Sequence, residues 1–179
     1  MGALTGFLPF LAFALGEKLL GVMPGLLCGA LASAALLWRQ RGAGEVDVLE
    51  AGGAVMFTAL ALLGLARPDA VGSLWLVRLW VDVGLLLVIL GGLALRRPFT
   101  LRHARRHVTP EVARMPRFLR TNQLLSAAWA GAFAVLVAAD LLMVARPDAP
   151  AIVAIGLSIA ALAAAAGFTR WFAGRVRGE

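Results

Sequence analysis

The chain has 179 residues, of which 61% are hydrophobic, and it carries 17 basic against 10 acidic side chains. A soluble domain of this length needs more polar side chains to cover its core, so a mean hydropathy of +0.86 excludes an ordinary soluble protein and predicts a polytopic membrane protein. The lone cysteine, Cys28, excludes an intramolecular disulfide, and we expect it to be a small packing residue.

Five apolar runs are long enough to cross a bilayer, which takes about 20 residues of helix. These runs cover residues 19–38, 49–66, 72–95, 118–144 and 151–172. A further apolar stretch, residues 3–15, is short and contains Pro9, so we expect it to be re-entrant or interfacial, with a six-span arrangement as the alternative. The sequence therefore predicts an all-α, five-span helical bundle that forms one membrane domain over residues 1–179.

The basic side chains are distributed unevenly among the connections between the predicted spans. Thirteen of the 17 lie in the 39–50 connection, the 96–120 connection and the tail from residue 170 onward. Cytoplasmic connections of multi-pass proteins are enriched in Lys and Arg. Abundant Ala, Gly and Arg are also typical of a GC-rich bacterial genome. We therefore expect a bacterial inner-membrane protein with a cytoplasmic C-terminus, in which Leu19 lies near the outer face.

Five ionisable side chains are predicted to meet in the outer half of the bundle. They are Glu17, Lys18, Arg78, Asp82 and Asp140. Within the apolar stretch "LWLVRLWVDVG", Arg78 and Asp82 stand four residues apart and so share one face of a helix. One interpretation is an ion-pair network that holds the helices together, with Arg78 reaching outward along its helix. The other is a shallow outward-facing polar pocket, because charges inside membranes often serve function. The near balance of signs favours the network.

The 96–117 segment is predicted to be a basic, amphipathic, cytoplasmic loop. Leu101, Ala104 and Val108 share one face of a short helix, while Arg102, His103 and Arg106 share the other. This pattern suits a helix in the headgroup layer of an anionic membrane. The expected headgroup contacts are Arg96, Arg97, Arg102, Arg105 and Arg106. The alternative is that these charges only set the orientation of the protein.

No pattern in the chain indicates catalysis, a cofactor or a metal. His103 and His107 have the spacing of a helical metal pair, but only Glu111 could join them, beyond a proline, so we interpret them as part of a solvated face. No phosphate-binding loop or nucleophile motif is present. We expect no nucleic acid partner, because the basic loop is tethered at the membrane and has few aromatic side chains.

Small residues recur at four-residue spacing in the last predicted span. The rows are Gly156, Ala160 and Ala164, and Ala163 and Gly167. Such rows allow close approach of helices in membranes. They could face neighbours within the chain or a second copy, so a homo-oligomer remains an alternative to partnership with other envelope or division proteins.

The order of elements resembles that of a known group of membrane proteins. The resemblance runs through "FLP" at 7–9, Lys18, Arg78 after Trp75, Arg97-Pro98, and "NQLLSAAWAGAF" at 122–133. On these residues the chain resembles the bacterial intracellular septation protein A family. Departures are Asp140, where a neutral polar residue is expected, and the Arg-rich cytoplasmic loop.

The resemblance implies a non-enzymatic inner-membrane protein with a role in envelope integrity, elongation or division through protein partners and lipids. No catalytic residues are implied. The alternative from another class is a small transporter, channel or lipid-handling protein that uses the outer polar cluster.

Overall fold

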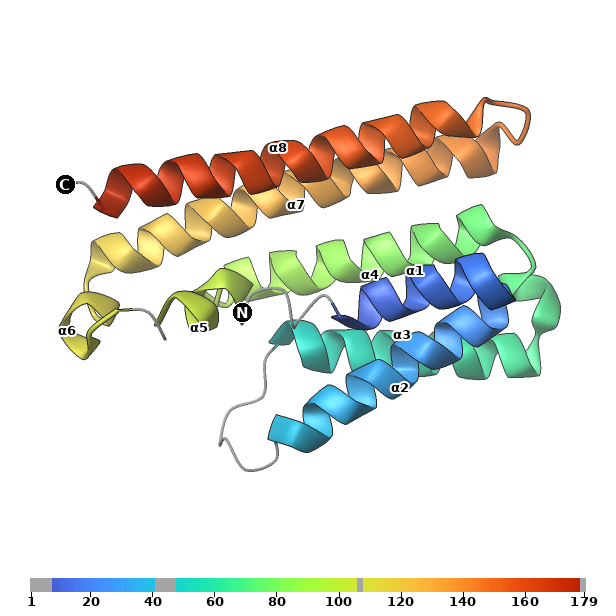
Figure 1. Ribbon diagram of the computed structural model, residues 1–179, viewed down its shortest axis with the longest axis horizontal. Coiled ribbons are helices and arrows are strands. Elements are labelled where there is room, and N and C mark those ends of the chain that lie inside the picture. The colour runs from blue at the N-terminus through green and yellow to red at the C-terminus, as the bar shows by residue number, and fades with distance from the viewer. Residues whose placement is uncertain (1–7, 41–47, 106–107, 178–179) are drawn as a thin grey trace. The chain divides into compact units, whose positions relative to one another are not determined.

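The computed structural model describes residues 8–40, 48–105 and 108–177, and these residues form eight α-helices and one 3-10 helix (Figure 1). The chain divides into two compact units, residues 1–88 and 89–179, and the boundary lies within helix α4, Leu74–Ala94. The predicted all-α architecture is confirmed for the described residues. A bilayer offers no hydrogen-bond partners to the backbone, and helices satisfy their own N–H and C=O groups.

The first unit begins with two helices joined by a single glycine. Helix α1 covers Leu8–Leu20 and helix α2 covers Val22–Gln40. Gly21 between them has a φ of +98°, a left-handed conformation that is strained for residues with a side chain. The Gly21 N–H donates to the Glu17 carbonyl oxygen at 2.9 Å and so closes the last turn of α1. Leu19 and Leu20 therefore end α1, whereas the sequence prediction had placed Leu19 at the start of the next helix.

Helices α1 and α2 pack with almost no side chain between them. A methyl group added to Gly16 would lie 2.9 Å from the Gly25 Cα atom, and one added to Gly25 would lie 2.7 Å from the Glu17 nitrogen. Cys28 also faces this contact, since its Sγ atom would lie 3.2 Å from a methyl group on Gly16. Cys28 thus occupies the packing position that we expected. Close approach of this kind supplies the dispersion contacts that hold helices together in lipid.

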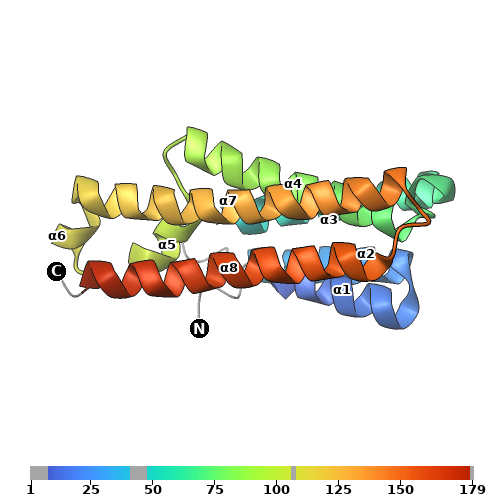
Figure 2. The same cartoon turned by 90° about the horizontal axis from the view of Figure 1, so that it is seen from above.

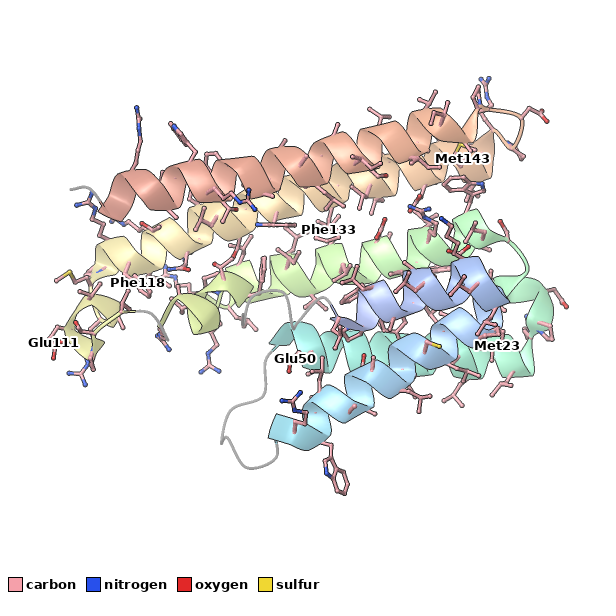
Figure 3. All side chains as sticks on the ribbon, viewed as in Figure 1. Met23, Glu50, Glu111, Phe118, Phe133 and Met143 are labelled. Atoms are coloured by element: carbon pink, nitrogen blue, oxygen red, sulfur yellow. The ribbon has the colours of Figure 1, made fainter. Side chains whose placement is uncertain are left out.

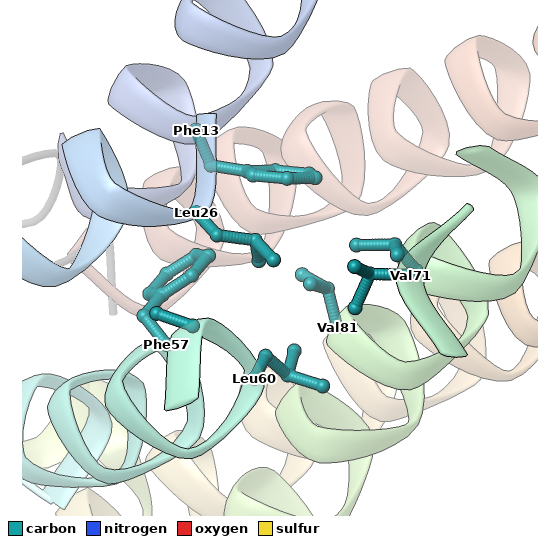
Figure 4. Packing of buried hydrophobic residues seen from close by; sticks show 8 residues of the cluster. Phe13, Leu26, Phe57, Leu60, Val71 and Val81 are labelled. Carbon is teal, nitrogen blue, oxygen red and sulfur yellow. The ribbon is translucent and has the colours of Figure 1, made fainter. Parts of the chain in front are cut away.

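The core of the first unit lies where these two helices meet α3, Val48–Ala66, the 3-10 helix η2, Pro68–Val71, and the start of α4 (Figure 4). Phe57 is fully buried at its centre, with ring centroids 5.1 Å from Phe10 and 5.7 Å from Phe13. At one end of the unit, Gly64 approaches the side chains of Met23 and Val71. The turn at Gly21 and the η2 connection therefore lie at the same end of this unit.

The second unit contains a long helical hairpin. Helix α7 covers Pro116–Ala145 and helix α8 covers Ala151–Arg177, and the two run side by side in both views (Figures 1 and 2). Two short helices precede them, α5 at Phe99–Arg105 and α6 at Pro110–Ala113. At 1.5 Å per residue, α7 is about 45 Å long and α8 about 40 Å, against a hydrocarbon core of about 30 Å. Part of each helix must extend beyond the hydrocarbon.

Among the described residues, four helices are long and apolar enough to cross a membrane. The qualifying segments are Val22–Arg39, Leu74–Ala94, Pro116–Ala145 and Ala151–Arg175. They correspond to four of the five predicted spans. The fifth, 49–66, also forms a helix, α3, but its apolar segment, Glu50–Ala66, is too short to be counted with these four, so the predicted number of five spans is not shown. Of the predicted re-entrant stretch 3–15, residues 3–7 lie outside the described residues, and the rest belongs to α1.

The Gly16–Gly25 contact generates a stability prediction. Gly25→Ala should lower the melting temperature in detergent, because its methyl group must push the α1 backbone away, a distortion that costs about 1–3 kcal/mol. Gly156→Ala is the matched control, since a methyl group there meets no described atom within 4 Å. Its melting temperature should be unchanged or higher. Equal melting of the two variants in circular dichroism would show that α1 and α2 are not closely packed.

Candidate functional site

Four of the five predicted outer ionisable side chains belong to one end of the first unit. Glu17 and Lys18 lie in the last turn of α1, and Arg78 and Asp82 lie in successive turns near the start of α4. The contact of Gly64 with Met23 and Val71 brings these two helix ends to the same end of the unit. Glu17, Arg78 and Asp82 are half-buried, while Lys18 is exposed.

Arg78 extends along its helix toward the helix start. Its guanidinium carbon lies 5.2 Å from the centre of the Trp75 ring. A cation over an indole face is attracted by the ring, by about 0.5–1 kcal/mol at exposed sites. The guanidinium therefore lies back along α4, over a ring of the preceding turn. The outward reach of Arg78 in a membrane stays a prediction.

Asp140 belongs to the other unit. It lies on α7, five residues before the helix ends, and only 1% of its surface is exposed. The structure therefore groups Glu17, Lys18, Arg78 and Asp82 in the first unit and places Asp140 in the second. Its deep burial sets it apart from the half-buried residues of the first unit. A carboxyl group so buried in a membrane-spanning helix is costly and often functional.

At the opposite end of α4, a tight turn presents two arginines. Arg97 N–H donates to the Gly92 carbonyl oxygen at 2.8 Å, and Arg96 N–H donates to the Leu93 carbonyl oxygen at 3.0 Å, which is the hydrogen-bond pattern of a Schellman cap. Arg96 has a φ of +54°, in the left-handed region where glycine is favoured. Both arginine side chains are exposed, while Pro98 after them is buried and leads directly into α5.

A chain of hydroxyl groups fastens α5 to α7. Thr100 Oγ1 donates to the Asn122 carbonyl oxygen at 3.0 Å, and it also lies 3.0 Å from Ser126 Oγ. Thr100 has one hydroxyl proton, so Ser126 must donate to Thr100 when Thr100 donates to Asn122. Sequence reasoning missed these residues. The signal was available in the four-residue spacing of Asn122 and Ser126, which places both on one face of α7.

Asn122 lies at the centre of this arrangement. It is 2% exposed, and its Nδ2 atom donates to the Phe118 carbonyl oxygen at 2.8 Å. Its Oδ1 atom is buried and has no hydrogen-bond partner among the described residues. The amide therefore uses only part of its hydrogen-bonding capacity.

Trp129 joins the same region to α8. Its Nε1 atom donates to Thr169 Oγ1 at 3.1 Å, and Thr169 in turn donates to the Ala165 carbonyl oxygen at 2.8 Å. The Phe99 ring meets Trp129 edge to face, with centroids 6.5 Å apart. Helices α5, α7 and α8 thus meet at one level along the hairpin. A tryptophan with an anchored N–H group is typical of the membrane interface.

The arginines between this level and the start of α7 or the end of α8, together with those of α5, form the basic end of the second unit. Of the predicted headgroup contacts, Arg96, Arg97 and Arg105 are exposed. Arg106 and His107 lie outside the described residues, as do the side chains of Arg102 and His103. The structure adds four exposed arginines that the prediction had not assigned to lipid, from the start of α7 and the end of α8. These are Arg117, Arg120, Arg170 and Arg175.

Glu111 is an acidic residue near the basic end. Figure 3 shows Glu111 on α6 near Phe118 at the start of α7, with Met143 at the other end of that helix. Hydrogen bonds from its own backbone N–H and from the Thr109 hydroxyl lower the pKa of its carboxyl group, so Glu111 is ionised at neutral pH. Among the described residues, no three His, Cys, Asp or Glu side chains lie close enough to hold a metal ion.

Comparison with protein-family models, with curated proteins and with solved structures gives no match. The four long apolar helices indicate a multi-pass membrane protein. The geometry adds a basic end at which three helices are joined through hydroxyl and aromatic side chains.

The hydroxyl chain generates a second prediction. Thr100→Val keeps the shape of the side chain but removes its hydroxyl, so α5 should detach more often from α7. Loss of both of its hydrogen bonds, at about 1 kcal/mol each, makes the opened state about thirtyfold more populated. Trypsin cleavage in α5, measured in detergent by mass spectrometry, should accelerate accordingly. Ser158→Ala is the control, because that hydroxyl donates at 2.9 Å to the Ala154 carbonyl oxygen within α8. An unchanged cleavage rate in Thr100→Val would contradict the anchoring role.

Proposed function

We propose that this chain is a non-enzymatic multi-pass protein of a bacterial inner membrane that supports envelope integrity or division by binding anionic lipids and protein partners. This is the role that its resemblance to the septation protein A family implies. The observation that carries the lipid part of the proposal is the position of α5. Thr100 ties this basic helix to a membrane-spanning helix, at the level where Trp129 bonds to Thr169.

The charge at this level suits an anionic membrane. Arg96, Arg97 and Arg105 are exposed at or near the two ends of α5. Each arginine near an anionic leaflet contributes about 1 kcal/mol, so three contribute about 3 kcal/mol, roughly a hundredfold preference over a neutral surface. Arg96 holds a left-handed conformation at which glycine would be less strained. A favourable headgroup contact of its side chain would offset that strain.

The proposed orientation places the basic end in the cytoplasm. With α3 as a fifth span, the connections at Gly21 and η2 both face outward, and the C-terminus lies inside. Helix α3 has 19 residues and is about 28 Å long, close to the thickness of the hydrocarbon core. The common end shared by Gly21 and η2 in the first unit supports this arrangement.

The proposal is tested by replacing Arg96, Arg97 and Arg105 together with Gln. Anionic phospholipid that co-purifies with the protein, measured by mass spectrometry, should fall severalfold, because three phosphate-binding groups are lost. Cells that depend on the variant should show a defect in length or in envelope integrity.

The matched control replaces Arg67 and Arg146, which lie in the connections at the other ends of the spans. This variant should retain its anionic lipid. If the triple variant keeps both its lipid and its cellular activity, the arginines act only in orientation and the proposed function is wrong.

Burial of Asp140 favours a second candidate function, the passage of a proton or another monovalent cation. A carboxyl group inside a membrane-spanning helix is a binding group for such ions.

This candidate requires that proteoliposomes containing the wild-type chain dissipate a pH gradient faster than empty liposomes do. Asp140→Asn should remove that excess flux while eluting as a monodisperse protein. A wild-type flux equal to that of empty liposomes, read with a pH-sensitive dye, would eliminate the second candidate.

A further inference from the structure

We propose that the cytoplasmic end of α8 carries a second headgroup site, in which Trp171 and Arg175 together bind the phosphodiester of an anionic phospholipid. The orientation of this end rests on the proposed function. The residues are separate from the α5 arginines. They are Phe168, Trp171, Phe172 and Arg175, called here the aromatic–Arg patch.

Trp171, the exposed ring of the patch, faces away from the hairpin. Thr169 points toward α7, because its hydroxyl accepts the Trp129 N–H. At about 100° per residue, Trp171 lies about 160° around the helix from Thr169, almost on the opposite side. In agreement, Trp171 is 54% exposed. The large apolar side chains of the first half of α8, among them Ile152 at 72% and Ile159 at 63%, are also exposed, as expected of a helix surface covered by lipid.

The patch is preassembled. The Phe168 and Phe172 rings stack with centroids 5.5 Å apart, and Trp171 lies 5.9 Å from Phe168 and 6.3 Å from Phe172. The Arg175 guanidinium carbon lies 4.7 Å from the centre of the Trp171 ring. When a guanidinium group stacks on an indole ring, only its face is in contact. The N–H donors along the edge of the guanidinium can still bind, and two of them match two oxygens of a phosphate. The indole thus restrains the arginine without using its donors.

The depth of the patch matches a lipid headgroup. We take the Trp129–Thr169 hydrogen bond as the level of the interface. Trp171 then lies about 3 Å and Arg175 about 9 Å further out, at 1.5 Å per residue. The headgroup layer on each side of the hydrocarbon is about 5–8 Å thick, so the Arg175 backbone lies just beyond it, and its guanidinium reaches back toward the layer over the Trp171 ring. A lipid with its acyl chains on α8 and its glycerol against Trp171 therefore presents its phosphate near Arg175.

The charge of the surroundings selects an anionic lipid rather than a zwitterionic one. Arg170 is exposed one residue before Trp171, and Arg175 follows at the next turn. The described residues of α8 contain no acidic side chain to neutralise these two charges. A choline or ethanolamine ammonium group would be repelled here, whereas a lipid whose only charge is its phosphate is favoured.

Native mass spectrometry of the full chain in neutral detergent tests the proposal, with phosphatidylglycerol as the probe and phosphatidylcholine as the comparison. Arg175→Gln and Trp171→Leu should each weaken phosphatidylglycerol binding about three- to fivefold, equivalent to about 1 kcal/mol. Trp171→Phe should retain much of the binding, because it preserves an aromatic face. Binding of phosphatidylcholine should not change, which also shows that the variants are folded.

The decisive variant is Trp171→Leu, because it changes no charge. Trp80→Leu is its control, since Trp80 is also half-exposed and lies on α4, and Arg146→Gln controls for loss of one positive charge. Wild-type affinity in Trp171→Leu would overturn the proposal, whether or not Arg175→Gln binds less. Competition by millimolar inorganic phosphate would also overturn it, because the site would then recognise the free ion rather than a lipid. The α5 triple variant tests the proposed function separately, so either idea can fail alone.

Discussion

The hydrocarbon of a bilayer provides no hydrogen-bond partner to a polar group. This constraint accounts for the hydrogen bonds that polar side chains make within and between the long helices. The hydroxyl groups of Ser158 and Thr169 each donate a hydrogen bond to the carbonyl oxygen four residues earlier in the same helix, at 2.9 and 2.8 Å. The Trp129 indole N–H, on α7, donates a hydrogen bond to Thr169 on α8. Buried atoms without a hydrogen-bond partner among the described residues include Ser33 Oγ and Asn122 Oδ1, on α2 and α7. Unpaired groups of this kind cost about 1–3 kcal/mol each.

The same constraint explains where helices come close together. Lipid tails are as apolar as leucine, so hydrophobic side chains alone contribute little free energy to the association of helices in a membrane. Glycine removes the side chain from the contact and lets backbones meet, as at Gly16 and Gly25 in the first unit. The glycines of α8 differ, because a methyl group on Gly156 or Gly167 would meet no described atom within 4 Å. These positions belong to the exposed surface of the helix rather than to its contact with α7.

The arginine side chains near the two ends of the proposed spans point in different directions relative to their helix ends. Arg78 lies near the start of α4 and reaches back over Trp75, whereas Arg175 lies beyond Trp171 at the end of α8. In both cases an indole ring supports a guanidinium group at a helix end. Side chains on a helix lean toward its N-terminus. Arg78 therefore leans toward the start of α4, while Arg175 leans back toward the middle of α8. The second geometry is the one that suits contact with a lipid phosphate.

Local composition was enough to predict the all-helical architecture and the positions of four helices that are long and apolar enough to cross a membrane, because hydropathy is a property of neighbouring residues. It could not place the break between α1 and α2, because the hydropathy of the run around Leu19 and Leu20 is the same whether or not Gly21 adopts a left-handed conformation. The sequence could place Asn122 and Ser126 on one face of α7, but it could not pair them with Thr100, which lies 22 and 26 residues earlier. The shared end of α1 and α4 and the pairing of Trp129 with Thr169 were likewise decided only by the tertiary structure. Such contacts depend on how helices pack against each other, and the energy of packing is not encoded in any one segment.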